Sequence, residues 1–261
     1  MSIYVAIILG IVQGITEFIP ISSSGHLAII GSFFDLGNHF TFDVLLNLGT
    51  LTALVWYTRL QLLSLVRDFL RGKYSIVIKL IIATIPAVLA GFLFSDFFEN
   101  LNTNIWIVVT MLLVIGILMI TVKQKTSALK SLNDISLKTA LIIGLAQTLA
   151  LIPGTSRSGV TILAGLFIGL GSGLAAEWSF LMAVPIVAGA SLKTLASIDG
   201  VQFVADNFWQ VLVGNVASFV VGLLAIDYMM KLLKHQNLRT FGLYRLCLGA
   251  ILVCLLIFGK I

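Results

Sequence analysis

The stretch "LGIVQGITEFIPISSSG" (residues 9–25) joins an apolar segment to a proline, three consecutive serines and a glycine. A second stretch, "IGLAQTLALIPGTSRSG" (residues 143–159), has a similar order of features. The apolar pieces on either side of each break are short for a membrane crossing, which takes about 20 residues. Short apolar segments interrupted by proline and glycine indicate re-entrant helical hairpins or broken helices, so the fold depends on these two breaks.

The composition of the whole chain indicates a membrane protein. Of its 261 residues, 59% are hydrophobic and 10% are charged, whereas a soluble domain carries about 25% charged residues. Uninterrupted stretches that are apolar enough to span a membrane lie at 40–58, 79–95, 105–122, 175–196, 208–230 and 243–259. We therefore expect an all-α polytopic protein whose residues 1–261 form a single membrane domain. The net charge of +5 does not point to nucleic acid, because the basic residues lie in short loops beside apolar segments.

The two interrupted stretches also predict an internal repeat. Glycines and glutamines match in order and at one constant separation, namely Gly10, Gln13 and Gly25 with Gly144, Gln147 and Gly159. The stretch "IATIPAVLAGFLFSDFF" (82–98) resembles "VGNVASFVVGLLAIDYM" (213–229) in the same way. Chance similarity between apolar segments is the alternative, but it does not explain ordered polar matches. We expect two repeats, about 1–125 and 135–261, each with one re-entrant hairpin and three transmembrane helices.

The loop charges predict how the repeats lie in the membrane. If neither interrupted stretch crosses, the loops 59–79, 123–138 and 231–245 share one face. They then hold most of the 16 basic residues, namely Arg59, Arg67, Arg71, Lys73, Lys79, Lys123, Lys125, Lys130, Lys138, Lys231, Lys234, Arg239 and Arg245. The positive-inside rule puts that face in the cytoplasm and both termini outside it. Three crossings per half give the repeats inverted topology, so their hairpins enter from opposite faces and meet near the middle.

Two polar hairpin tips would then share one place in the membrane. The first tip supplies Gln13, Glu17, Ser22, Ser23, Ser24 and His26, and the second supplies Thr155, Ser156, Arg157 and Ser158. The planar fork of arginine binds oxyanions, and helix starts near Gly25 and Gly159 attract anions. Glu17 is the natural counter-charge of Arg157, and it could hold a divalent cation or act as a base. A serine, a base and an anion clamp indicate a nucleophilic phosphoryl-transfer site.

A purely structural role and a transport role compete with catalysis at these tips. Serine and threonine in membrane helices often satisfy carbonyl groups that proline and glycine leave free. A single intramembrane Glu–Arg pair can be a structural staple or the switch of a transporter. Inverted repeats with broken helices are typical of transporters, so a lipid flippase also fits. Ser23 separates these functions, because a flippase needs no nucleophile.

The motifs "QGITEFIPISSSGH" (13–26) and "PGTSRSG" (153–159) resemble those of the undecaprenyl-diphosphate phosphatase family, also called bacitracin-resistance proteins. The resemblance covers essentially the full length. It implies a hydrolase that converts undecaprenyl diphosphate to undecaprenyl phosphate and inorganic phosphate, which recycles the lipid carrier for cell-wall polymers. It also implies a multi-pass protein of the bacterial plasma (inner) membrane whose site opens to the extracytoplasmic side and uses Mg²⁺ or Ca²⁺. It leaves a homodimer open.

Carried over by position, the resemblance assigns roles to individual residues. Ser23 corresponds to the nucleophile, His26 to a general acid or base, and Glu17 to the carboxylate for metal binding or proton transfer. The diphosphate-binding set is led by Arg157 and includes Ser22, Ser24, Gly25, Thr155, Ser156, Ser158 and Gly159. Gln13 stands where many family members have glutamate, so it would be a weaker metal ligand than Glu17. Direct attack by activated water remains an alternative to a covalent phosphoserine.

Overall fold

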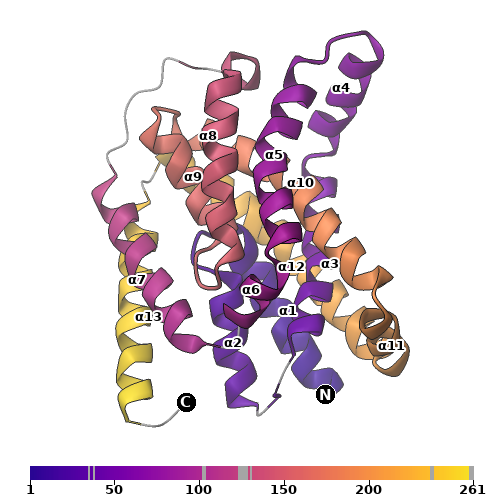
Figure 1. The fold of residues 1–261 in the computed structure, drawn as a ribbon, viewed down its shortest axis with the longest axis vertical. Helices are drawn as coiled ribbons and strands as arrows, with labels where there is room; N and C mark the ends of the chain where they lie inside the picture. The colour runs from indigo at the N-terminus through magenta and orange to yellow at the C-terminus, as the bar shows by residue number, and fades with distance from the viewer. Residues whose placement is uncertain are drawn as a thin grey trace.

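A computed structural model describes residues 1–34, 36–37, 39–101, 104–122, 129, 131–235 and 238–258. All regular elements within these residues are helical (Figure 1). In chain order they are α1 (Ile3–Phe18), α2 (Ser23–Phe33), α3 (Phe40–Tyr57), α4 (Arg59–Leu70), α5 (Ser75–Leu93), α6 (Ser95–Leu101), α7 (Ile105–Thr121), η1 (Leu132–Asp134), α8 (Leu137–Thr148), η2 (Leu149–Leu151), α9 (Arg157–Phe167), α10 (Ser172–Ala196), α11 (Ile198–Asp206), α12 (Phe208–His235) and α13 (Arg239–Ile257).

Five of the described helices are long and apolar enough to cross a membrane, namely α3, α5, α10, α12 and α13. The remaining predicted span, α7, is apolar and 17 residues long. The chain is therefore a multi-pass membrane protein. In Figure 1, α1 begins and α13 ends at the lower end of the molecule, whereas α4 lies at the upper end.

Both predicted breaks separate two helices. The first lies between α1 and α2, which pack against each other, and the second lies between α8 and α9, which also pack against each other. The helices after the breaks begin at Ser23 and Arg157, two residues before the predicted starts at Gly25 and Gly159. The difference arises because serine side chains cap these helices, and a capping serine precedes the first helical residue.

The predicted basic loops contain more structure than expected. The loop 59–79 holds α4, whose residues are all at least partly exposed. Within the predicted loop 231–245, Arg245 is not a loop residue, because it lies in α13 and is fully buried. Three other predicted loop residues, Lys123, Lys125 and Lys130, lie outside the described residues.

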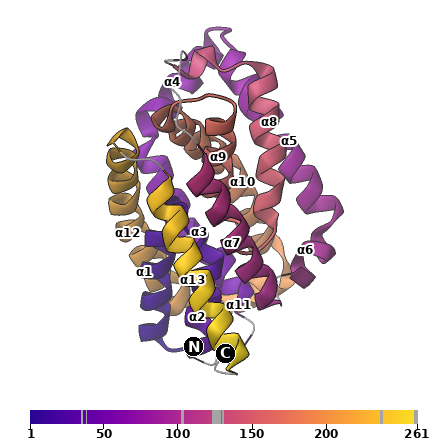
Figure 2. The ribbon, with the colours of Figure 1, turned by 90° about the vertical axis from the view of Figure 1, so that its left-hand side faces the viewer.

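Small residues let the long helices approach closely. A side chain at Gly10 of α1 would overlap the backbone of α12 at Gly214, and one at Gly144 of α8 would overlap the backbone of α5. On another flank α7 and α13 lie side by side (Figure 2), and a Cβ atom at Gly242 would come within 2.7 Å of the Gly116 carbonyl oxygen. Close packing through glycine is the usual way that membrane helices associate, and here it fixes the scaffold that carries both breaks.

The largest apolar cluster lies beside the two breaks. The rings of Phe18, at the end of α1, and Phe180, on α10, meet edge to face with centroids 5.7 Å apart. Trp178 of α10 and Ile162 of α9 belong to the same cluster and are fully buried. The breaks therefore rest on packed side chains, which holds their polar residues in defined positions.

Candidate active site

The two breaks share the same local geometry. Ser22 and Ser156 precede α2 and α9, and both have a positive φ, 76° and 72° respectively. Each hydroxyl accepts a hydrogen bond from the backbone N–H three residues later, at 3.3 Å from Gly25 and 3.2 Å from Gly159. A positive φ in a residue other than glycine costs about 1–3 kcal/mol and persists where the surroundings enforce it. The same strained cap in both places indicates that each turn is built to present the next residue, Ser23 or Arg157.

Direct hydrogen bonds join the two turns. The Ser24 hydroxyl accepts a hydrogen bond of 3.3 Å from the N–H of Gly154. In the opposite direction, Ser158 donates to the backbone carbonyl of Glu17 at 3.1 Å. Residues of the first turn therefore lie against residues of the second.

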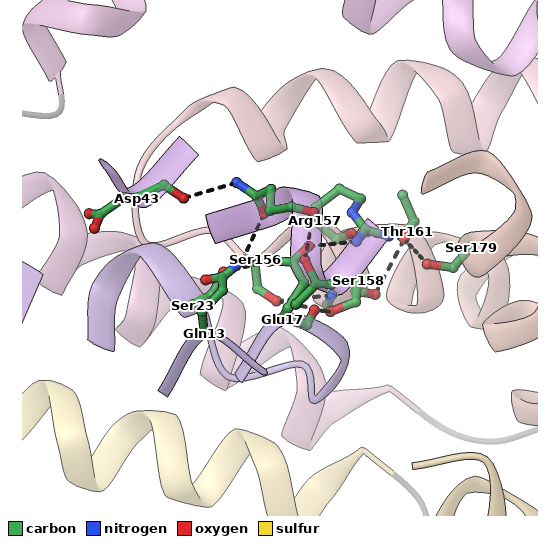
Figure 3. A network of polar contacts seen from close by, with 12 residues as sticks. Gln13, Glu17, Ser23, Asp43, Ser156, Arg157, Ser158, Thr161 and Ser179 are labelled. Atoms are coloured by element: carbon green, nitrogen blue, oxygen red, sulfur yellow. Dashed lines mark hydrogen bonds and ion pairs between the residues drawn. The ribbon is translucent and has the colours of Figure 1, made fainter. Parts of the chain in front are cut away.

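Glu17 is the centre of the polar contacts in this region (Figure 3). Its Oε1 forms an ion pair of 2.6 Å with Nη2 of Arg157. Its Oε2 accepts hydrogen bonds from the Ser23 hydroxyl at 2.7 Å and from Nε2 of Gln13 at 3.2 Å. The Arg157 and Glu17 side chains are 11% and 10% exposed, so the pair is almost withdrawn from solvent. The structure thus brings Ser23, Glu17, Gln13 and Arg157 together.

A cavity of about 520 Å³ opens over this cluster. Its polar wall includes Gln13, Glu17, Ser23, Ser24, Ser156 and Arg157. Residues of α3 and of the segment before it line its other end. There Nε2 of His39 lies 3.4 Å from Oδ2 of Asp43. Asn47 links the two ends, because its Oδ1 accepts a hydrogen bond of 2.8 Å from Nε2 of Gln13.

Two of these lining residues, His39 and Asn47, were not expected at the site from the sequence. The available signal was the pair Asp43 and Asn47, two polar residues one helical turn apart in an apolar span. Such residues usually face the protein interior or a cavity. The packing of α3 against α1 brings both residues to the cavity, and the sequence does not reveal this packing.

Several predicted phosphate ligands lie behind the cavity wall. Ser22, Gly25, Thr155, Ser158 and Gly159 are buried and do not line the cavity. The amides of the two glycines are already bonded to the capping serines, so in this arrangement they are not offered to an anion. Ser24, Ser156 and Arg157 are the members of the predicted set that reach the cavity.

His26 forms its hydrogen bonds with residues other than Ser23, and it does not line the cavity. Its Nδ1 lies 2.7 Å from the backbone oxygen of Ser22, and its Nε2 lies 2.7 Å from the Tyr244 hydroxyl. Because a carbonyl oxygen only accepts, Nδ1 donates to Ser22, and Nε2 forms the second hydrogen bond of the ring with the Tyr244 hydroxyl. Both ring nitrogens are occupied, so this arrangement uses His26 to hold the turn.

Unpaired polar atoms show what the cavity could bind. Arg157 Nη1 is buried without a hydrogen-bond partner, and so are the oxygens Gln13 Oε1 and Asp43 Oδ1. A free guanidinium N–H suits a phosphate oxygen. Among the described residues no group of three His, Cys, Asp or Glu side chains surrounds a common point. Glu17 and Gln13, which both line the cavity, carry oxygen donors of the kind that hard cations take as ligands.

Comparisons with known proteins agree on one family. The family model described as "Bacitracin resistance protein BacA" matches residues 6–251. An undecaprenyl-diphosphatase of Rubrobacter xylanophilus is 39% identical over 97% of both chains. An undecaprenyl-diphosphatase of Idiomarina loihiensis is 38% identical over 98% of this chain and 99% of its own, and one of Latilactobacillus sakei is 36% identical over 97% of both. With two matching turns, a Glu17–Arg157 pair and full-length similarity, this chain belongs to the BacA family of bacitracin resistance proteins.

Proposed function

We propose that this protein hydrolyses undecaprenyl diphosphate to undecaprenyl phosphate and inorganic phosphate. This reaction recycles the lipid carrier for cell-wall polymers and confers bacitracin resistance. The observation that carries the proposal is the serine hydroxyl of Ser23, bonded at 2.7 Å to Glu17 and facing a cavity that Arg157 also lines. The relatives named undecaprenyl-diphosphatase supply the substrate.

The geometry supports a nucleophilic mechanism. Arg157 holds the diphosphate through its unpaired Nη1, with the hydroxyls of Ser24 and Ser156 beside it. Ser23 Oγ attacks the terminal phosphorus as its proton passes to Glu17 Oε2, and the bond from that phosphorus to the bridging oxygen breaks. Undecaprenyl phosphate leaves. Water then attacks the phosphorus of the phosphoserine, and the bond from that phosphorus to Ser23 Oγ breaks. Ser23 Oγ takes the proton that Glu17 holds, the proton of the attacking water passes to Glu17 or to the phosphate, and inorganic phosphate leaves. Direct attack by water that Glu17 activates is the alternative.

The proposed reaction also uses a divalent cation, Mg²⁺ or Ca²⁺. Glu17 and the free Gln13 Oε1 are the residues that would hold it, together with the diphosphate oxygens. Such an ion, when bound, neutralises charge on the phosphates. Gln13 is also held by Asn47, which orients its oxygen independently of any ligand.

We propose further that the chain is two repeats of inverted topology, each with a re-entrant hairpin. The packing is reciprocal, which supports this proposal. The first hairpin packs through α1 on α12, and the second packs through α8 on α5. Helices α5 and α12 carry the two stretches that resemble each other in sequence. Each hairpin therefore packs on the matching helix of the other repeat.

The same proposal sets the orientation in the bacterial plasma membrane. The end of the molecule that carries α4, with Arg59 and Arg67, faces the cytoplasm. The opposite end, where α1 begins and α13 ends, is extracytoplasmic, and the cavity opens to that side. A reporter that is active only outside the cytoplasm, fused to the C-terminus, should give signal. A silent reporter on a stable, membrane-inserted fusion would overturn the topology.

The function is tested by phosphate release from undecaprenyl diphosphate in detergent. We expect metal-dependent release by the wild type and a loss of at least about 10²-fold in Ser23→Ala and in Arg157→Ala. Ser64→Ala on exposed α4 is the matched control and should retain full activity. Release that survives Ser23→Ala would retain the hydrolase and replace the covalent step by water attack. A folded wild type that releases no phosphate would contradict the proposal and direct attention to lipid translocation.

A further inference from the structure

Arg245 is a fully buried arginine with no role in the mechanism above. It lies on α13, its side chain is 0% exposed, and its guanidinium has no carboxylate partner among the described residues. A buried charge without a counter-ion is costly unless hydrogen bonds satisfy it. The hydrogen bonds of Arg245 must therefore explain why a charged side chain is tolerated in the protein interior.

Within the described part of the chain Arg245 donates four hydrogen bonds, and each goes to a backbone carbonyl group. Nη1 donates to Pro20 at 3.4 Å, and Nη2 donates to Gly154 at 2.7 Å. Nε and Nη2 also donate to Leu112 and Met111 of α7, at 3.3 and 3.1 Å. One guanidinium thus joins the first turn, the second turn and a transmembrane helix.

The two turn carbonyls lie where the helical ladder is interrupted. Pro20 follows the end of α1, and Gly154 precedes α9, so neither carbonyl can be satisfied within a continuous helix. In a membrane an unsatisfied carbonyl is costly, because no water is available there to bond it. Arg245 therefore satisfies both turns at once, and it does so from behind the cavity, which it does not line.

The neighbouring residue of α13 reinforces the first turn. The Tyr244 hydroxyl lies 2.7 Å from Nε2 of His26, and the two rings stack with centroids 5.8 Å apart. His26 in turn bonds the carbonyl of Ser22, the residue directly before Ser23. Two adjacent side chains of α13 consequently hold the segment that presents Ser23.

We propose that Arg245 is a positioning residue that fixes the first turn, with Ser23, relative to the second turn, with Arg157. This role rests on the proposed hydrolase function. A displacement of about 1 Å between reacting groups can cost about 10²-fold in rate. Loss of Arg245 should therefore lower kcat much more than it changes KM, because Arg157 itself stays available to bind the diphosphate.

The first experiment compares Arg245→Met and Arg245→Lys with Arg67→Gln, an exposed arginine of α4, as control. We expect Arg245→Met to lower kcat about 10²-fold with KM within about threefold of the wild type. Arg245→Lys keeps the charge but cannot reach all four carbonyls, so its kcat should lie between those of the wild type and Arg245→Met. Arg67→Gln should match the wild type.

A second readout needs no catalysis. Cysteines introduced as Ser24→Cys and Pro153→Cys, in a chain whose exposed Cys247 and Cys254 are replaced by serine, sit on neighbouring turns. A short bifunctional thiol reagent should cross-link them, and Arg245→Met should slow the cross-linking at least several-fold.

The outcomes separate the two proposals. If the wild type hydrolyses nothing, the function fails while the cross-linking still tests Arg245. Two results would overturn the positioning role. The first is a folded Arg245→Lys variant with wild-type kcat and wild-type cross-linking. The second is an Arg245 variant that yields less folded protein but has unchanged kcat and KM. If Arg245→Met does not fold, the Arg245→Lys result decides.

Discussion

Replacing Glu17 by glutamine removes two functions of its carboxylate that can be measured separately, namely the counter-charge to Arg157 and the acceptor of the Ser23 proton. Glu17→Gln keeps the shape of the side chain but leaves the guanidinium of Arg157 without a counter-charge in a site where both side chains are about one-tenth exposed. Removing one partner of a buried ion pair costs about 3–5 kcal/mol. We expect about 3 kcal/mol, because the amide oxygen still accepts a hydrogen bond. For a chain of this size that is a fall in Tm of roughly 6–12 °C.

The catalytic loss should be separable from this instability. Glutamine cannot take the proton of Ser23, so kcat should fall by about 10²–10⁴-fold. The double variant Glu17→Gln/Arg157→Met removes both charges, and it should regain roughly 2 kcal/mol of stability over Glu17→Gln alone while remaining inactive. Thermal unfolding in detergent and phosphate release measure the two effects. A double variant whose destabilisation equals the sum of the single variants would refute the buried-pair reasoning.

Further predictions concern the turn, the helix packing and the metal. Ser156→Ala keeps the positive φ and loses the helix cap, whereas Ser156→Gly loses the cap but relieves the backbone strain. Ser156→Ala should therefore lower the free energy of unfolding by about 1–2 kcal/mol more than Ser156→Gly. Thermal unfolding of both variants measures the difference. Gly10→Ala should destabilise the protein by about 1–3 kcal/mol, because its Cβ overlaps the Gly214 carbonyl, whereas Gly173→Ala, with open space around it, should not. Chelation should abolish phosphate release, and adding back Mg²⁺ or Ca²⁺ should restore it; undiminished release in chelator would remove the metal from the mechanism.

The sequence was sufficient for the long apolar helices and for the location of the polar breaks, but it did not predict the short helices α4, α6 and α11. A run of apolar residues in a membrane has few alternatives to a helix, so the predicted spans and observed helices agree within a few residues at most ends. The pairing of Glu17 with Arg157 was also foreseeable, because each is the isolated charge of its apolar stretch. A charged side chain inside a membrane is costly unless it is paired, so an isolated acid and an isolated base in two apolar stretches indicate a contact.

The residues that the sequence did not reveal act across the fold. Arg245 looked like a loop residue because it lies near the start of the last span, and its partners are carbonyl groups, which no side-chain pattern reports. Tyr244 lies near the start of the last span, where an aromatic residue usually anchors a helix at the membrane interface, yet its hydroxyl bonds His26. The resemblance assigned His26 the role of a general acid or base, but its ring bonds the Ser22 carbonyl and the Tyr244 hydroxyl of α13.

The polar residues at the two breaks satisfy one another across the two turns. Either turn alone would leave carbonyl groups, hydroxyls and a charge in an apolar medium. Together, Glu17 neutralises Arg157, Ser158 satisfies the Glu17 carbonyl, and Arg245 satisfies one carbonyl of each turn. What remains unsatisfied at the cavity, chiefly Arg157 Nη1 and Gln13 Oε1, is the part that an anionic headgroup and its cation would complete. Hydrogen bonds within the protein thus satisfy many of the polar groups that the two turns bury.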